Sequence, residues 1–245
     1  MLKADNIYAG YGGDAVLRGV TFSADKSLAV IGPNGSGKTT LLRCIAGLMP
    51  FSGDILIDGA PVAGAARKTL AKKVALLSQI SHVYFQYNVF ETVMMGRYAH
   101  MGGTLPMPSP QDRDIVEDAM LMTGVSDLRA RELGTLSGGQ LQRVMLAKTF
   151  AQMPQIILLD EPVNHLDIRF RLELIEHLKL WKNSVIGVFH DITLAMDFCD
   201  DLMLMCGGRA AARGSPREVA PCFEEVYGAD VTSYMKKSLE VWREL

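Results

Sequence analysis

The chain has 245 residues, with 25 lysine and arginine residues against 27 aspartate and glutamate residues, and 49% of its residues are hydrophobic. This length and composition are ordinary for one large folded domain and exclude disorder, collagen and coiled coil as the main architecture. The formal net charge of −2 also argues against a dedicated nucleic-acid binder, which usually carries a basic excess.

Short apolar runs that suit buried strands alternate with helical patterns along much of the chain. Strands are expected at 28–31, 74–77, 156–159, 185–189 and 202–205, and helices near 38–48, 112–123, 138–152, 168–181 and 192–199. This alternation predicts an α/β domain with a largely parallel sheet. Turn sequences within residues 1–25 and 52–60 instead predict antiparallel hairpins. The region from about 84 to 150 is expected to be mostly helical.

A glycine-rich segment follows the first of these strands and opens the next helix. It consists of Gly32, Pro33, Asn34, Gly35, Ser36, Gly37, Lys38, Thr39 and Thr40. Its first eight residues match G-x-x-x-x-G-K-[ST], in the strand-to-helix context that this phosphate-binding motif requires. Glycines allow successive N–H groups to face inward and bind anionic oxygens, and the helix N-terminus adds partial positive charge. Lys38 is expected to neutralise the β- and γ-phosphates of a nucleotide, and Thr39 to bind Mg²⁺. The loop alone does not distinguish kinases, GTPases, helicases and transport ATPases.

The strand expected at 156–159 ends in two consecutive carboxylates, Asp160 and Glu161. Functional groups of open α/β sheets gather at the carboxyl ends of the strands. Asp160 is placed to hold Mg²⁺, and Glu161 points elsewhere and can polarise an attacking water. Phosphoryl transfer requires both of these roles, so the two acids complement the phosphate loop.

Residues 136–140 read L-S-G-G-Q, stand between the phosphate loop and the acidic strand, and precede a long helical pattern. Ser137 is expected to cap this helix, whose free N–H groups face outward with those of Gly138 and Gly139 as a second anion site. The segment, which Gln140 completes, resembles the signature of the ATP-binding-cassette (ABC) transporter ATPases. The resemblance implies that this site covers the γ-phosphate held by a second copy, so that two Mg-ATP are sandwiched in a head-to-tail dimer.

Further positions resemble the family one by one. Tyr11 lies where the family has an aromatic residue that stacks on adenine, with Tyr8 as the competing candidate. Gln79 resembles the hinge glutamine that reaches Mg²⁺ and the attacking water. Asp167 resembles the residue that communicates across the dimer, and it also suits a helix N-cap. His190 resembles the switch histidine that binds the γ-phosphate and the catalytic glutamate.

The resemblance covers essentially the whole chain and implies its organisation. We expect a single ABC ATPase domain over 1–245, with a P-loop NTPase (RecA-like) core. Residues 1–83 and 153–245 would form this core with an antiparallel β subdomain, and residues from about 84 to 152 a helical signature subdomain. One departure is Val163, where the family usually carries threonine or serine.

The segment 88–100 is similar to a stretch of the importers for iron chelates and cobalamin, and residues 226–228 also fit that subgroup. An iron chelate (siderophore or haem) or cobalamin is therefore the expected cargo. A metal ion or an oxyanion, export instead of import, and a role in DNA repair or translation without transport are the alternatives.

The expected partners are a second copy of the chain, integral-membrane permease subunits, and an extracytoplasmic substrate-binding protein that acts through the permease. No nucleic-acid partner is expected. Since the chain has no apolar segment that could span lipid, the resemblance implies a peripheral location on the cytoplasmic face of the membrane. Four aromatic residues suit a groove for a short permease helix, namely Tyr84, Phe85, Tyr87 and Phe90. Ordinary core packing is the alternative for each of them taken singly.

Overall fold

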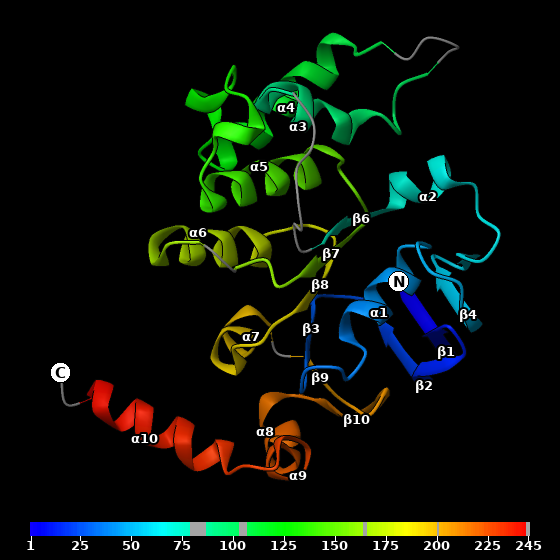
Figure 1. Cartoon of the computed structure of the whole chain (residues 1–245), viewed down its shortest axis with the longest axis vertical. Helices are drawn as coiled ribbons and strands as arrows, with labels where there is room; N and C mark the ends of the chain where they lie inside the picture. Colours follow the sequence, from blue (N-terminus) through cyan, green and yellow to red (C-terminus); the bar gives the residue numbers. More distant parts are fainter. Residues whose placement is uncertain (79–86, 103–106, 164–165, 200, 244–245) are drawn as a thin grey trace.

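The computed structural model describes residues 1–78, 87–102, 107–163, 166–199 and 201–243 (Figure 1). Its strands are β1 (Leu2–Tyr11), β2 (Asp14–Ala24), β3 (Leu28–Ile31), β4 (Ser52–Ile57), β5 (Ala60–Pro61), β6 (Val74–Leu77), β7 (Ile156–Asp160), β8 (Ser184–Val188), β9 (Leu202–Cys206) and β10 (Arg209–Gly214). Its α-helices are α1 (Lys38–Ile45), α2 (Arg67–Lys73), α3 (Val89–Met94), α4 (Pro110–Met122), α5 (Gly138–Ala151), α6 (Ile168–Lys179), α7 (Ile192–Phe198), α8 (Pro216–Val219), α9 (Phe223–Tyr227) and α10 (Val231–Arg243). Short 3-10 helices are η1 (Met95–Arg97), η2 (Ser126–Leu128), η3 (Leu133–Thr135) and η4 (Ala220–Cys222).

A six-stranded sheet with the order β10-β9-β3-β8-β7-β6 forms the centre of the molecule. Its strands are parallel except β10, which pairs antiparallel with β9. Because side chains alternate across a strand, Ile157 and Leu159 of β7 enter one core with α6 and α7, whereas Ile156 and Leu158 enter a second core with α1. Figure 1 shows α1 on one side of this sheet and α6 and α7 on the other.

A four-stranded antiparallel sheet with the order β2-β1-β4-β5 covers the α1 side. The tight turn between β1 and β2 brings Tyr11 opposite Asp14. Asp58 and Gly59 connect β4 to β5 with φ of +50° and +76°, as a two-residue hairpin turn requires. Both predicted hairpin regions are therefore confirmed.

The helical region between β6 and β7 begins its helices with specific caps. Asn88, Ser109 and Ser137 each form a capping box, so α3, α4 and α5 start where a side chain satisfies free backbone N–H groups. The buried residues Val93 and Val116 contribute to the core that these helices share with one face of the central sheet.

The predicted α/β class with a largely parallel sheet, an antiparallel β flank and a helical insertion is confirmed. The five predicted strands match β3, β6, β7, β8 and β9 within one residue at each end. Helix α2 and strand β10 were not predicted, because α2 buries none of its residues and β10 is a half-buried, alanine-rich run. Among the described residues, no helix is both long and apolar enough to cross a bilayer.

Candidate functional site

A hollow of about 580 Å³ opens above the carboxyl end of β3, where the glycine-rich loop turns into α1. Its lining joins the loop to the acidic strand end and to the predicted histidine, and consists of Tyr11, Val16, Asn34, Gly35, Ser36, Gly37, Lys38, Thr39, Thr40, Glu161 and His190. The structure thus brings together residues from five separate segments of the sequence. This edge of the parallel sheet is the one at which α/β proteins bind their ligands.

Two glycines of the loop have positive φ angles and close neighbours, so that another residue would be strained there. Gly32 has a φ of +145°, and a Cβ there would lie 2.2 Å from the carbonyl oxygen of Met205. Gly37 has a φ of +99°, and a Cβ there would lie 2.8 Å from the Leu17 side chain. The backbone path that points the N–H groups inward therefore depends on these glycines.

Lys38 is buried, and its ammonium donates hydrogen bonds to the carbonyl oxygens of Gly32 and Pro33 at 2.7 and 2.9 Å. Burial lowers the pKa of Lys38, and the nearby carboxylates of Glu161 and Asp160 oppose this effect. The ammonium thus lies inside the loop on weak neutral acceptors, where anionic oxygens of a phosphate would be stronger partners.

Thr39 and Asp160 form a pair of oxygen ligands at the rim of the loop. The Thr39 hydroxyl donates to Oδ1 of Asp160 at 3.1 Å, and Asp160 is only 5% exposed. Burial raises the pKa of Asp160, and the Glu161 carboxylate adds to that increase, while the Thr39 hydrogen bond lowers it. A hydroxyl and a carboxylate in contact fit Mg²⁺, which takes few protein oxygens and completes its shell with water and phosphate.

The Ser36 hydroxyl is a further sign of a ligand in this hollow. Ser36 is 4% exposed, and its Oγ is buried without a hydrogen-bond partner among the described residues. A buried hydroxyl without a partner costs free energy unless a ligand or water satisfies it. Thr40, also of the loop, is buried as well.

Glu161 and His190 lie at the ends of the neighbouring strands β7 and β8. Glu161 has a φ of +55°, and its backbone N–H donates to the Val188 carbonyl oxygen at 3.1 Å. This left-handed conformation turns the Glu161 side chain away from the direction of Asp160 and toward His190, whose Nε2 hydrogen-bonds to Oε1 of Glu161. Backbone strain of this kind, about 1–3 kcal/mol, gathers at functional sites.

The L-S-G-G-Q segment lies on a surface apart from this hollow. The Ser137 Oγ accepts from the Gln140 N–H at 3.3 Å, and the Gln140 side chain accepts from the Ser137 N–H at 3.0 Å, as predicted for a helix cap. Ser137 and Gly138 are exposed, Gly139 is half-buried, and none of these residues lines the hollow at the phosphate loop.

Helix α5 also holds the segment that follows the acidic strand. The buried Gln142 amide donates to the Pro162 carbonyl oxygen at 3.2 Å. Asp167 caps α6 through the Phe170 N–H at 2.8 Å, and it forms an ion pair with Arg143. Two of these residues, Gln142 and Arg143, were missed in the sequence, because their partners follow only from how α5 packs.

Tyr11, not Tyr8, lines the hollow at the phosphate loop. The Tyr11 hydroxyl accepts a hydrogen bond from Arg43 of α1 at 3.1 Å. Tyr8 lies on β1, where its hydroxyl approaches Gly19. Arg43 was also missed, although it follows Thr39 by one helical turn and therefore lies on the same face of α1.

Some predicted residues are outside the structural description. Gln79 and the aromatics Tyr84 and Phe85 lie outside the described residues. The other two predicted groove residues, Tyr87 and Phe90, are described and differ in how far their rings are covered. Tyr87 is 42% exposed, whereas the guanidinium of Arg129 lies 4.0 Å from the ring centre of Phe90 and covers it.

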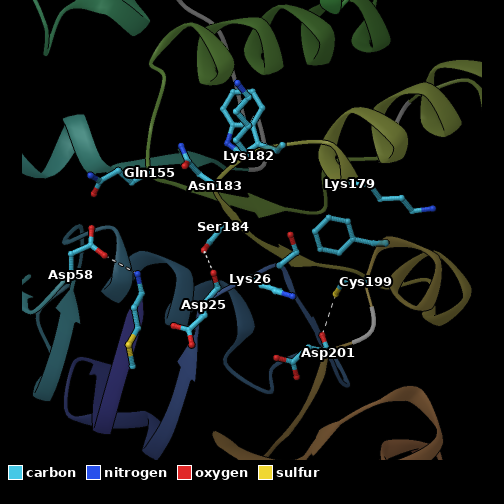
Figure 2. A pocket seen from close by; sticks show the side chains of 14 residues that line it. Asp25, Lys26, Asp58, Gln155, Lys179, Lys182, Asn183, Ser184, Cys199 and Asp201 are labelled. Carbon is cyan, nitrogen blue, oxygen red and sulfur yellow. Dashed lines mark hydrogen bonds and ion pairs between the residues drawn. The ribbon is translucent and has the colours of Figure 1, made fainter.

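A second cavity, of about 710 Å³, lies at the amino ends of the strands, opposite the phosphate loop (Figure 2). Its polar groups are partly satisfied within the wall, because Ser184 bonds to the Asp25 carbonyl oxygen at 3.1 Å and Asp58 to the amino group of Met1 at 2.7 Å. It contains none of the motif residues.

Three comparisons with known proteins agree on the family that this chain resembles. Residues 18–164 match the family model described as ABC transporter. The uncharacterised ABC transporter ATP-binding protein YvrA of Bacillus subtilis (strain 168) is 37% identical over 97% of this chain, which spans 56% of YvrA's length. The ferric enterobactin transport ATP-binding protein FepC of Escherichia coli (strain K12) is 34% identical over 93% of this chain and 87% of its own. A solved dimeric structure of a bacterial ABC transporter cassette is 25% identical, covers 88% of this chain and 98% of its own, and has a TM-score of 0.79.

Proposed function

The chain belongs to the ABC transporter family, and from that premise we propose that it is the ATP-hydrolysing subunit of an importer with a separate membrane permease. The observation that carries the proposal is the single hollow lined by Lys38, Thr39, Glu161 and His190, with Asp160 hydrogen-bonded to Thr39 at its rim. These side chains supply the parts that phosphoryl transfer from ATP requires.

The phosphate loop binds the nucleotide phosphates. Lys38 exchanges the carbonyl oxygens of Gly32 and Pro33 for phosphate oxygens, which are stronger acceptors for an ammonium. Thr39 and Asp160 hold Mg²⁺, which when bound neutralises charge on the phosphates. The Tyr11 ring, oriented by Arg43, stacks on the adenine base.

Glu161 orients the water that attacks the γ-phosphate, and His190 holds the Glu161 carboxylate in place. The hydrogen bond between Nε2 of His190 and Oε1 of Glu161 supports these roles, because it holds the carboxyl group at the edge of the hollow. The same histidine lines the hollow and binds the γ-phosphate. Gln79 is proposed to join this site from the segment that follows β6.

The active unit is a head-to-tail dimer of two copies around two Mg-ATP. The outward-facing N–H groups at the start of α5, capped by Ser137, support a second anion site that serves the partner copy's nucleotide. Asp167, at the start of α6, lies at the proposed contact between the copies. Residues 1–83 and 153–245 form the RecA-like core with its antiparallel β flank in this proposal, and residues from about 84 to 152 form the helical signature subdomain.

The proposed docking surface for the permease is an apolar hollow of about 340 Å³ between α2 and η1. Met95 and Tyr98 are 38% and 62% exposed at its edge, and Ala99 lies in its wall. A short amphipathic helix can anchor apolar side chains in such a groove. Docking here holds the chain on the cytoplasmic face of the membrane, and an extracytoplasmic binding protein delivers cargo to the permease from the other side.

We propose an iron chelate, a siderophore or haem, or else cobalamin, as the cargo, which the ferric enterobactin relative and the segment 88–100 support. The test has two steps. Purified chain should hydrolyse Mg-ATP and co-purify with a membrane subunit, and a deletion strain should lose uptake of labelled ferric siderophore, haem or cobalamin. Hydrolysis stimulated by nucleic acid, without any membrane partner, would contradict transport and favour a role in DNA repair or translation.

A further inference from the structure

Gln152 follows α5 directly and lines two adjoining hollows. One is the proposed docking surface of about 340 Å³, and the other, of about 710 Å³, lies between α2 and the end of α1, near Leu48 and Phe51. Figure 1 shows α2 and β6 at the place where the helical region meets the central sheet. Gln152 is thus at the junction of the two halves of the molecule, directly beneath the surface where a permease segment would bind.

The Gln152 side chain ties α5 to the junction between α2 and β6. Its Nε2 donates to the carbonyl oxygen of Ala71 at 2.5 Å and to that of Val74 at 2.7 Å, which uses both amide hydrogens. Carbonyl groups in the last turn of a helix have no partner within the helix, and Ala71 lies in that turn of α2. The amide therefore caps α2 and holds the first residue of β6 at once.

The helical side of this junction is closely connected. The buried Arg97 of η1 donates to the Ala151 carbonyl oxygen at 2.9 Å and forms an ion pair with Asp112 of α4 at 2.8 Å. Gly96 packs so closely on α5 that a Cβ would lie 2.3 Å from the Lys148 carbonyl oxygen. A force on η1 therefore moves the end of α5, and Gln152 with it.

The sheet side of the junction leads to the acidic strand. Strand β6 starts at Val74, which pairs with Ile156, and continues in parallel register with β7 until Leu77 pairs with Leu159. Asp160 is the next residue of β7. Because paired strands shift together, the position of Val74 bears on the position of the proposed Mg²⁺ ligand.

Helix α2 itself is anchored mainly by hydrogen bonds and buries little surface. None of its seven residues is buried, although Leu70 packs against one core. Besides the bonds to Gln152, the Lys68 ammonium donates to the Met101 carbonyl oxygen at 2.6 Å. An element anchored in this way can shift without disrupting a packed core.

We propose that Gln152 is a positioning residue that transmits permease docking to the ATP site. A segment bound between η1 and α2 changes their separation, and the Gln152 amide converts this change into a shift of Val74 and β6. This inference rests on the proposed docking surface and adds the residue that connects it to catalysis. Gln152 touches neither nucleotide nor water, so its effect is on coupling between the two sites.

The test compares Gln152→Met with a matched control, Gln155→Met. Methionine keeps the length of the side chain and removes both donors. Gln155 is exposed before β7 and lines the cavity at the amino ends of the strands, not the two hollows at Gln152. Each variant is assayed as the isolated chain and in the complex with the membrane subunit that co-purifies with the wild-type chain. The readouts are kcat and KM for ATP, the yield of complex, and transport.

Isolated Gln152→Met should keep both kcat and KM for ATP within about twofold of wild type, whereas the stimulation of kcat by the membrane subunit should fall about tenfold. Gln155→Met should resemble wild type in both states. Stimulation of Gln152→Met equal to that of Gln155→Met would overturn the proposal. If Gln152→Met does not fold, Gln152→Asn replaces it, because the shorter side chain keeps the amide but cannot reach both carbonyl oxygens. The same results are then expected, and the same result would overturn the proposal. A wild-type chain that no membrane subunit stimulates would overturn the proposed function, and this role with it.

Discussion

Glu161 and His190 meet through a hydrogen bond between Oε1 and Nε2, although they are 29 positions apart in the sequence. They meet because β7 and β8 are parallel neighbours, with Asp160 opposite Val188, so that both strands end at the same edge of the sheet. The positive φ of Glu161 completes the arrangement by aiming its carboxylate across to His190 while Asp160 faces Thr39. Two adjacent carboxylates thus receive different partners and different proposed roles.

Replacing Glu161 by glutamine should separate ATP binding from ATP hydrolysis. The amide keeps the size of the side chain but cannot act as a base toward water, so kcat should fall by about 10²–10⁴. ATP affinity should remain, because the phosphates bind to the loop and Lys38, and an ATP-bound dimer should accumulate on size-exclusion chromatography. Glu173→Gln, at an exposed position of α6, is the matched control. Wild-type turnover in Glu161→Gln would remove Glu161 from the mechanism.

Thr39→Val should weaken Mg²⁺ binding while it preserves the shape of the loop. Valine lacks the hydroxyl that contacts Asp160 and is proposed to bind the metal. The Mg²⁺ concentration that half-saturates ATP hydrolysis should rise at least about tenfold. Thr39→Ser retains the hydroxyl and should stay close to wild type. An unchanged Mg²⁺ dependence in Thr39→Val would show that Thr39 is not a ligand.

Tyr11→Ala should weaken ATP binding by about tenfold, which is the lower range for the loss of one base–aromatic stack. Tyr11→Phe should bind ATP nearly as well as wild type, because it keeps the ring and loses only the bond from Arg43. Tyr8→Ala tests the competing aromatic and should have no effect, since Tyr8 does not line the hollow. Fluorescence titration with an ATP analogue measures the affinity of all three variants. If Tyr8→Ala weakened binding and Tyr11→Ala did not, Tyr8 would be the residue that stacks on adenine.

Much of the fold and the site could be predicted from local sequence. The buried strands are short apolar runs. The motifs at Lys38, Asp160 and Ser137 each lie within one continuous segment, so their chemistry can be recognised without knowledge of tertiary contacts. Helix α2 could not be predicted, because its sequence has no apolar period and nothing in it is buried.

The missed contacts have a different origin. Arg43 with Tyr11, Arg143 with Asp167, and Gln152 with Val74 each join residues that are 24 to 78 positions apart. These pairings depend on which helix faces which strand, so they appear only when the tertiary packing is known. The positive φ of Glu161 could not be predicted either, because glutamate carries no intrinsic preference for this backbone conformation.

The ion pair between Arg97 and Asp112 should make the stability of the helical region depend on acid. Both side chains are buried, at 8% and 10% exposure. Hydrogen bonds from Ser109 and Arg97 lower the pKa of Asp112 from 3.8 to about 2. Because the pKa in the folded chain lies below its unfolded value, the fold favours the ionised form. The resulting stabilisation, about 2 kcal/mol, is complete above pH 3.8 and is lost as the pH falls toward 2.

Asp112→Asn should therefore destabilise the chain by at least about 3 kcal/mol at neutral pH, because it also leaves the buried Arg97 guanidinium without its counter-charge. Urea unfolding at several pH values measures the difference from wild type, which should stay constant from pH 7 to about 5 and shrink below pH 4. The exposed Asp114→Asn, on the same helix, should change stability by less than about 0.5 kcal/mol at any of these pH values. A difference between wild type and Asp112→Asn that does not shrink in acid would show that the loss comes from packing, and that the Asp112 charge contributes little.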